Sequence, residues 1–60
     1  MRIIVDYQDN QGNAHRKIAT NVERHENYMI YNVLFHEEEK TLILPINSVR
    51  YIEEKEIKED

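Results

Sequence analysis

The sequence predicts an all-β fold of five short antiparallel strands arranged as a meander. The first observation is the segment 27–36, Asn-Tyr-Met-Ile-Tyr-Asn-Val-Leu-Phe-His. Its aromatic and β-branched residues, and the turn formers on either side, are typical of a central strand. The second observation is that the other apolar runs are short and alternate with polar residues, which indicates further half-buried strands.

A helix over residues 27–40 is the competing interpretation of the central segment, because Asn27 is a good N-cap residue and the stretch is long enough. Tyrosine, isoleucine, valine and phenylalanine lose rotamer freedom in a helix, and the apolar residues do not form a single stripe. We therefore assign a strand. Both of its faces are apolar: Tyr28, Ile30 and Leu34 point one way, and Met29, Tyr31, Val33 and Phe35 point the other.

The first two strands are predicted at residues 2–8 and 14–22. The turn between them contains the one glycine of the chain, and Gly12 or Asn13 can adopt the left-handed conformation that a short hairpin loop needs. Alternation predicts that the inward side chains of these strands are Ile3, Val5, Tyr7, Ile18, Thr20 and Val22. The outward side chains are then Ile4, His15, Lys17, Ala19 and Asn21.

The remaining elements are shorter. Residues 37–40 are predicted to form a turn and 41–44 the fourth strand, which Pro45 ends because proline has no N–H to donate. In this part of the chain the expected inward residues are Leu42, Leu44 and Ile46, and Ile43 faces outward. Residues 46–48 are predicted as a short turn or one turn of 3₁₀-helix, and 49–52 as a brief fifth strand. The single domain is thus expected to span residues 1–52, and the charged residues 53–60 to form a flexible tail.

The composition limits the classes of function. The chain has 60 residues and no cysteine, so we expect one domain without a disulfide or a thiolate metal site. The net charge of −4 lies entirely from Glu37 onward, because residues 1–36 hold four acidic and four basic residues. This acidic half argues against general nucleic-acid binding, which depends on neutralising phosphates. With no bilayer-spanning run and no signal-like segment, we expect a cytoplasmic protein.

Two motifs resemble a known family. Pro45-Ile46-Asn47-Ser48-Val49 looks like the Pro-x-Asn-x-Val ending of SH3-type barrels, where a 3₁₀ turn leads into the last strand, and Asp6-Tyr7 resembles the Asp-Tyr of their first strand. Sm-like barrels share this plan of five short, bent strands. The resemblance implies a small SH3-like or Sm-like barrel. It does not imply polyproline recognition, because the chain has no tryptophan and has Ser48 where such SH3 domains have a tyrosine.

Residues suited to catalysis are few. Ser48 is the single serine, the two threonines lie within predicted strands, and the glutamates lie in solvated turns or the tail, where nothing raises their pKa. We therefore predict a protein that is not an enzyme and uses no cofactor.

The predicted function is protein binding through an outward apolar face. If one face of the central strand fills the core, the other face needs a cover, and Ile4 and Ile43 extend that outward face onto neighbouring strands. Such a protein would be a small regulator or inhibitor that docks on a larger protein or associates with its own copies. The partner-binding residues are expected to be Ile4, Met29, Tyr31, Val33, Phe35 and Ile43.

The alternative is an Sm-like oligomer that binds nucleic acid. The basic residues concentrate at His15, Arg16, Lys17 and Arg24, and Tyr28 offers a ring for stacking on a base. A minor hypothesis is a divalent metal held by His15 and His36 with Glu37 or Glu39, since a meander places these turns at one end of the sheet. Surface histidines beside turns are the simpler interpretation, and no metal site is predicted.

Overall fold

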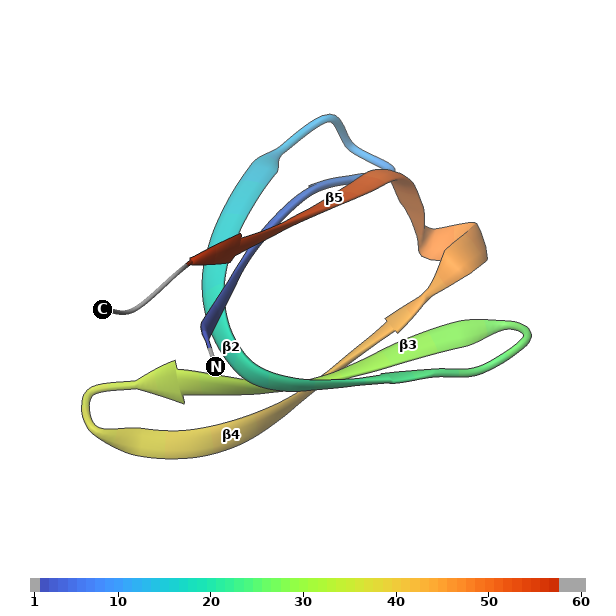
Figure 1. Ribbon diagram of the computed structural model, residues 1–60. Helices are drawn as coiled ribbons and strands as arrows, with labels where there is room; N and C mark the ends of the chain where they lie inside the picture. The colour runs from blue at the N-terminus through green and yellow to red at the C-terminus, as the bar shows by residue number, and fades with distance from the viewer. Residues whose placement is uncertain (1, 58–60) are drawn as a thin grey trace.

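The computed structural model describes residues 2–57, which form one antiparallel sheet (Figure 1). Its strands lie side by side in the order β4-β3-β2-β1-β5. The predicted all-β class, the five antiparallel strands and the 3₁₀ turn before the last strand are confirmed. The elements in chain order are β1 (Arg2–Asp9), β2 (Ala14–Arg24), β3 (Tyr28–Phe35), β4 (Glu38–Pro45), the 3₁₀-helix η1 (Ile46–Ser48) and β5 (Val49–Ile57).

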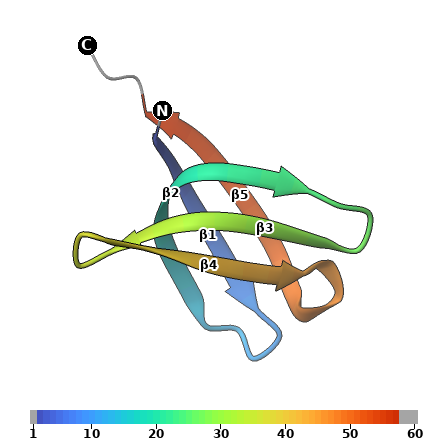
Figure 2. The same ribbon diagram turned by 90° about the horizontal axis from the view of Figure 1, so that it is seen from below.

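The sheet is curled but not closed. β1 to β4 follow one another as the predicted meander, and η1 then carries the chain across so that β5 pairs with the other side of β1. β4 and β5 are therefore the two edges of the sheet and are not paired with each other. Figures 1 and 2 show the strands bending around a common interior, with η1 spanning the gap between the two edges.

The core lies on the inner face of this curl. The predicted inward residues of β1 are confirmed, and they meet buried side chains from β2, β3 and β4. Val22, Leu42, Val49 and Ile52 are partly buried and pack against this core. The buried side chains are Ile3, Val5, Tyr7, Ala19, Met29, Tyr31, Val33 and Leu44.

The prediction that Met29, Tyr31 and Val33 face outward is wrong, because all three are buried. The strand register gives the reason. Met29 pairs with Leu44 and Tyr31 with Leu42, and directly paired residues lie on the same face of a sheet. Since Leu42 and Leu44 face the core as predicted, the odd-numbered residues of β3 must face it too. The outer face of β3 therefore carries the other apolar set, Tyr28, Ile30 and Leu34.

A β-bulge in β2 overturns another part of the predicted pattern. The pairing with β3 shifts between Ala19 and Asn21, so Thr20 is an extra residue in β2. Before the bulge, Ala19 is buried and Ile18 is 41% exposed, the reverse of the prediction. After it, the alternation changes phase, so Val22 packs against the core as predicted.

The first and third hairpin turns contain residues with a positive φ. In the first, Gly12 has a φ of 86°, as expected for a left-handed position, and the Asp9 carboxylate accepts hydrogen bonds from the backbone N–H groups of Gln11 and Asn13. The third turn is not at residues 37–40. It is a two-residue turn at His36 and Glu37, whose φ values of 49° and 66° are both positive, and β4 begins at once with Glu38.

The last strand is longer than predicted. β5 runs to Ile57 and pairs with β1 along its length, from Asp9 opposite Val49 to Arg2 opposite Ile57. The prediction of a separate flexible tail from residue 53 is therefore wrong for residues 53–57, because β1 supplies hydrogen-bond partners for their backbone. The part of the predicted tail at 58–60 lies outside the described residues.

Candidate functional site

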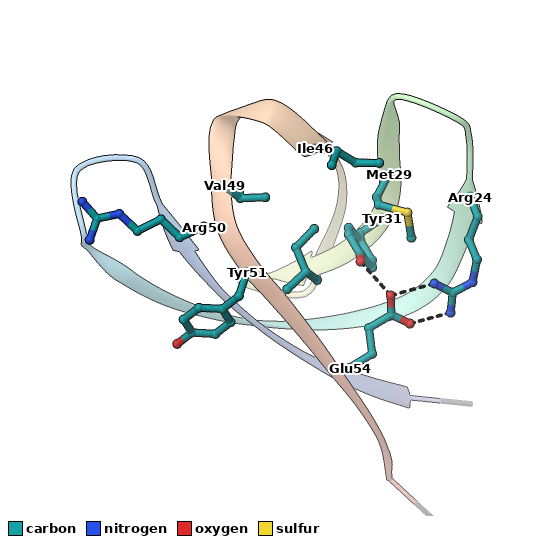
Figure 3. Close-up of a pocket in the computed structure, with 9 residues that line it drawn as sticks. Arg24, Met29, Tyr31, Ile46, Val49, Arg50, Tyr51 and Glu54 are labelled. Atoms are coloured by element: carbon teal, nitrogen blue, oxygen red, sulfur yellow. Dashed lines mark hydrogen bonds and ion pairs between the residues drawn. The ribbon is translucent and has the colours of Figure 1, made fainter.

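The candidate site is an open groove of about 360 Å³ where η1 and β5 pass over the ends of β2 and β3 (Figure 3). It exists because the sheet is curled without edge-to-edge pairing, so the inner face remains accessible at this end. The residues that line it are Arg24, Met29, Tyr31, Ile46, Val49, Arg50, Tyr51, Ile52 and Glu54. We call it the η1 groove.

One end of the η1 groove is apolar. Figure 3 shows Met29, Ile46 and Val49 gathered there, on three different elements. Ile46 is held in place because its N–H donates to the carbonyl oxygen of Asn27 across 3.0 Å. The side chain was predicted to be core but is 46% exposed, because the turn after Pro45 lifts it from the floor of the groove to its rim.

The other end of the η1 groove is closed by a network of side chains around the Glu54 carboxylate. Arg24 donates two hydrogen bonds to it, Nη1 to Oε2 at 3.0 Å and Nη2 to Oε1 at 2.7 Å. The Tyr31 hydroxyl donates to Oε2 at 2.8 Å. Because Glu54 is on β5, Arg24 on β2 and Tyr31 on β3, the network joins β5 to two strands that are not its neighbours in the sheet.

The network gives the buried Tyr31 hydroxyl a hydrogen-bond acceptor. Tyr31 is fully buried, and an unpaired hydroxyl in that position would be costly. The Glu54 side chain is 19% exposed and the Arg24 side chain 64%, so the ion pair has one sheltered partner and one solvated partner. The hydrogen bonds from Arg24 lower the pKa of Glu54, and the Tyr31 hydroxyl lowers it further. Burial raises the pKa of Tyr31, and the Glu54 carboxylate adds to that rise.

These pKa shifts point away from acid–base catalysis. A general acid or base works best when its pKa lies near the working pH. The pKa of Glu54 moves down and that of Tyr31 moves up, so both move away from neutrality. Glu54 and Tyr31 therefore serve hydrogen bonding and charge balance in the η1 groove, which also offers apolar contact.

The predicted partner-binding residues are not brought to one face. Phe35 and Ile43 are 52% and 55% exposed, and Ile4 is half-buried beside Ile18 on the outer face. Met29 and Tyr31 line the floor of the η1 groove from inside. Val33 belongs to the inner face near the opposite end of β3.

Of the residues that line the η1 groove, sequence reasoning named only Arg24, Met29 and Tyr31 as candidate site residues. Glu54 and Ile46 are the most important of those it missed. Glu54 was assigned to a solvated tail, and no local signal shows that β5 continues through it. Ile46 was assigned to the core, although the preceding proline and the short turn it begins were a usable sign that alternation stops there.

The predicted nucleic-acid residues are dispersed. Arg16 alternates with His15 and Lys17 along β2, so it points to the opposite face of the strand. Three of these side chains already contact a carboxylate: Arg16 Nε lies 2.7 Å from Asp6, His15 Nε2 lies 3.0 Å from Asp9, and Arg24 is held by Glu54. The Tyr28 ring stacks on His25 with 4.5 Å between ring centroids.

The histidines do not form a metal site with the glutamates. No group of three histidine, aspartate, glutamate or cysteine side chains within residues 2–57 is arranged to hold a metal ion. His15 instead stacks on Tyr7, and the ring of His36 meets that of Phe35 edge-on.

Comparisons with known proteins assign no relative: the chain matches no protein family, no curated protein and no solved structure. Across the described strands and the single 3₁₀ turn, there is no helix with the length and apolar character needed to cross a membrane.

Proposed function

We propose that this protein is a non-catalytic protein-binding module whose curled sheet is a small barrel of the SH3-like kind. In this proposal the η1 groove takes an extended apolar segment of a partner protein. The protein would then act as a small regulator or inhibitor by docking on a larger one.

One observation carries the proposal: the η1 groove has an accessible apolar end, while the charges at its other end are already paired with each other. An occupant therefore gains by burying an aliphatic or aromatic side chain against Ile46, Val49 and Met29. It does not need to supply a charge to Arg24, because Glu54 already does so. A volume of about 360 Å³ is within the range of ligand pockets.

The barrel part of the proposal is supported by topology. The strand order β4-β3-β2-β1-β5, and the 3₁₀ turn between the fourth and fifth strands, agree with the plan that the Pro45-x-Asn47-x-Val49 motif implied. Fold alone carries no function, so the functional proposal depends on the η1 groove.

The test is a selection of short peptides from a display library against the whole protein, followed by binding measurements with two matched variants. Ile46→Glu places a charge on the rim of the η1 groove. Ile43→Glu makes the same change at a similarly exposed isoleucine on the outer face of β4. We expect selected apolar peptides to lose at least about tenfold in affinity with Ile46→Glu, because burying one such side chain contributes roughly 1.5–3 kcal/mol. Ile43→Glu should change little.

Two results would overturn the proposal. In the first, both variants bind the selected peptides as well as the unmodified chain does. In the second, the protein binds an oligonucleotide with an affinity that falls steeply as salt rises, which would favour the nucleic-acid alternative.

A further inference from the structure

A second groove lies at the opposite end of β3, beside the hairpin that joins it to β4. It has a volume of about 290 Å³ and shares no residue with the η1 groove. Figures 1 and 2 both show this hairpin projecting at the margin of the sheet, away from η1. We call it the hairpin groove, and its lining residues are Lys17, Val33, Leu34, Phe35, Lys40, Thr41 and Leu42.

The hairpin groove exposes large apolar side chains. Phe35 is 52% exposed, although it lies two residues from buried Val33 on the same face of β3. Its ring is contacted at one edge by His36, with 4.3 Å between ring centroids. Leu34 is also exposed, so the end of β3 presents two adjacent apolar residues to solvent. Apolar side chains that gather at a hollow are more informative than scattered ones.

The same groove holds two lysines, and one of them has no carboxylate partner. Within residues 2–57, the Lys17 side chain makes no ion pair or hydrogen bond. Lys40 Nζ lies 3.8 Å from Glu38 Oε2, a long contact between exposed side chains. By contrast, Arg16 and Arg24 each lie 2.7 Å from a carboxylate. Lys17, with Lys40 beside it in the same apolar hollow, therefore complements a ligand that carries a carboxylate.

The backbone next to the hairpin groove is also open. β4 is an edge of the sheet and pairs only with β3, so the outer side of its backbone has unpaired N–H and C=O groups. An extended peptide can add to such an edge as a further strand. Lys40 and Leu42 are two residues apart and therefore point to the same face.

We propose that the β4 edge and the hairpin groove together bind an extended acidic segment of a partner protein. The segment adds to β4 as a sixth strand. On one face it carries a carboxylate for Lys40 and Lys17 and, two residues away, an aliphatic side chain that packs on Leu42. This site goes beyond the η1 groove, because it takes a different peptide at the other end of β3.

The experiment uses two labelled eight-residue peptides with blocked ends, titrated into the whole protein at low and at physiological salt. The acidic probe repeats Glu-Thr-Val-Thr, and the basic probe repeats Lys-Thr-Val-Thr. We expect the acidic probe to bind at least about tenfold more tightly, with an affinity that falls as salt rises. Amide protons of β4 should exchange more slowly when that probe is bound, because the added strand takes up their free side.

Protein variants locate the site. Lys17→Glu with Lys40→Glu should reverse the preference between the two probes. Lys55→Glu, an exposed lysine on β5, is the matched control and should leave the preference intact. If the double variant fails to fold, Lys17→Gln with Lys40→Gln is expected to abolish the preference. Ile46→Glu in the η1 groove should not affect either probe, so failure of this inference is distinguishable from failure of the proposed function.

Several outcomes would overturn the inference. These are no binding of the acidic probe up to millimolar concentration, equal binding of the two probes, or unchanged binding by both lysine variants. Light scattering covers a further possibility: a mass that rises with concentration, and that the lysine variants return to a monomer, would show that a second copy of the chain occupies the groove instead.

Discussion

Replacing Glu54 by alanine removes the acceptor at the centre of the network that joins β5 to β2 and β3. Two lost interactions contribute to the decrease in the free energy of unfolding. Tyr31 is fully buried, and its hydroxyl would lose its hydrogen-bond acceptor, which costs about 1–3 kcal/mol. Arg24 is 64% exposed, so loss of its ion pair adds little to this cost. We expect a total loss of roughly 1–3 kcal/mol.

That loss is large for a chain of this size. A domain of 60 residues has a free energy of unfolding of about 3–9 kcal/mol. Each kcal/mol shifts the Tm of such a domain by roughly 4–8 °C. Glu54→Ala should therefore lower the Tm by at least about 4 °C. Glu53→Ala, at the preceding and exposed position of β5, is the control and should lower it only slightly.

A double-mutant cycle isolates the hydroxyl. Tyr31→Phe removes the group that Glu54→Ala leaves unpaired, so the double variant should be more stable than the sum of the single losses predicts. The assay is urea unfolding followed by circular dichroism, with all four proteins at the same pH. The reasoning is refuted if Glu54→Ala and Glu53→Ala have the same stability, or if the two changes in the cycle add without coupling.

The pH dependence has a definite sign. Because Arg24 and Tyr31 lower the pKa of Glu54 in the folded state, the carboxylate stabilises the fold above its unfolded pKa of about 4.5. This contribution is lost as the pH falls through the lower, folded pKa. The stability difference between the unmodified chain and Glu54→Gln should thus be constant from pH 7 to about 5.5 and shrink below about 4.5. A difference that does not change down to pH 3 would contradict the assignment.

Two further predictions concern β3, β4 and the turn between them. Glu37→Gly should raise the free energy of unfolding by up to about 1 kcal/mol, because glycine tolerates the left-handed conformation that a residue with a Cβ adopts there at a cost. Urea unfolding measures this; Glu39→Gly within β4 should be destabilising, and a loss of stability in Glu37→Gly would contradict the prediction. Tyr31→Glu should prevent folding because it buries a carboxylate, whereas Ile43→Glu should fold with a nearly unchanged Tm because that side chain is exposed. Circular dichroism distinguishes the two, and equal loss of structure in both would show that the face assignment of β3 and β4 is incorrect.

Local sequence signals predicted the elements in which the residue types allow only one conformation or only one buried face. In β1, apolar residues alternate with polar ones, so only one face can be buried, and Ile3, Val5 and Tyr7 lie in the core. Gly12 marks the first turn because it is the residue that tolerates a positive φ. Pro45 predicts the end of β4 and the 3₁₀ turn after it, because it cannot donate to a ladder.

Tertiary structure decided the rest, because the remaining choices depend on pairing between distant residues. β3 is apolar on both faces, so alternation gives no answer, and only its register with Leu42 and Leu44 selects Tyr31 for the core. The bulge at Thr20 arises from the pairing of β2 with β3. The residues after 52 look like a solvated tail, yet β1 pairs with them and places Glu54 over the Tyr31 hydroxyl. Both grooves exist because the sheet curls without closing, a property of five strands together that no single segment of the sequence encodes.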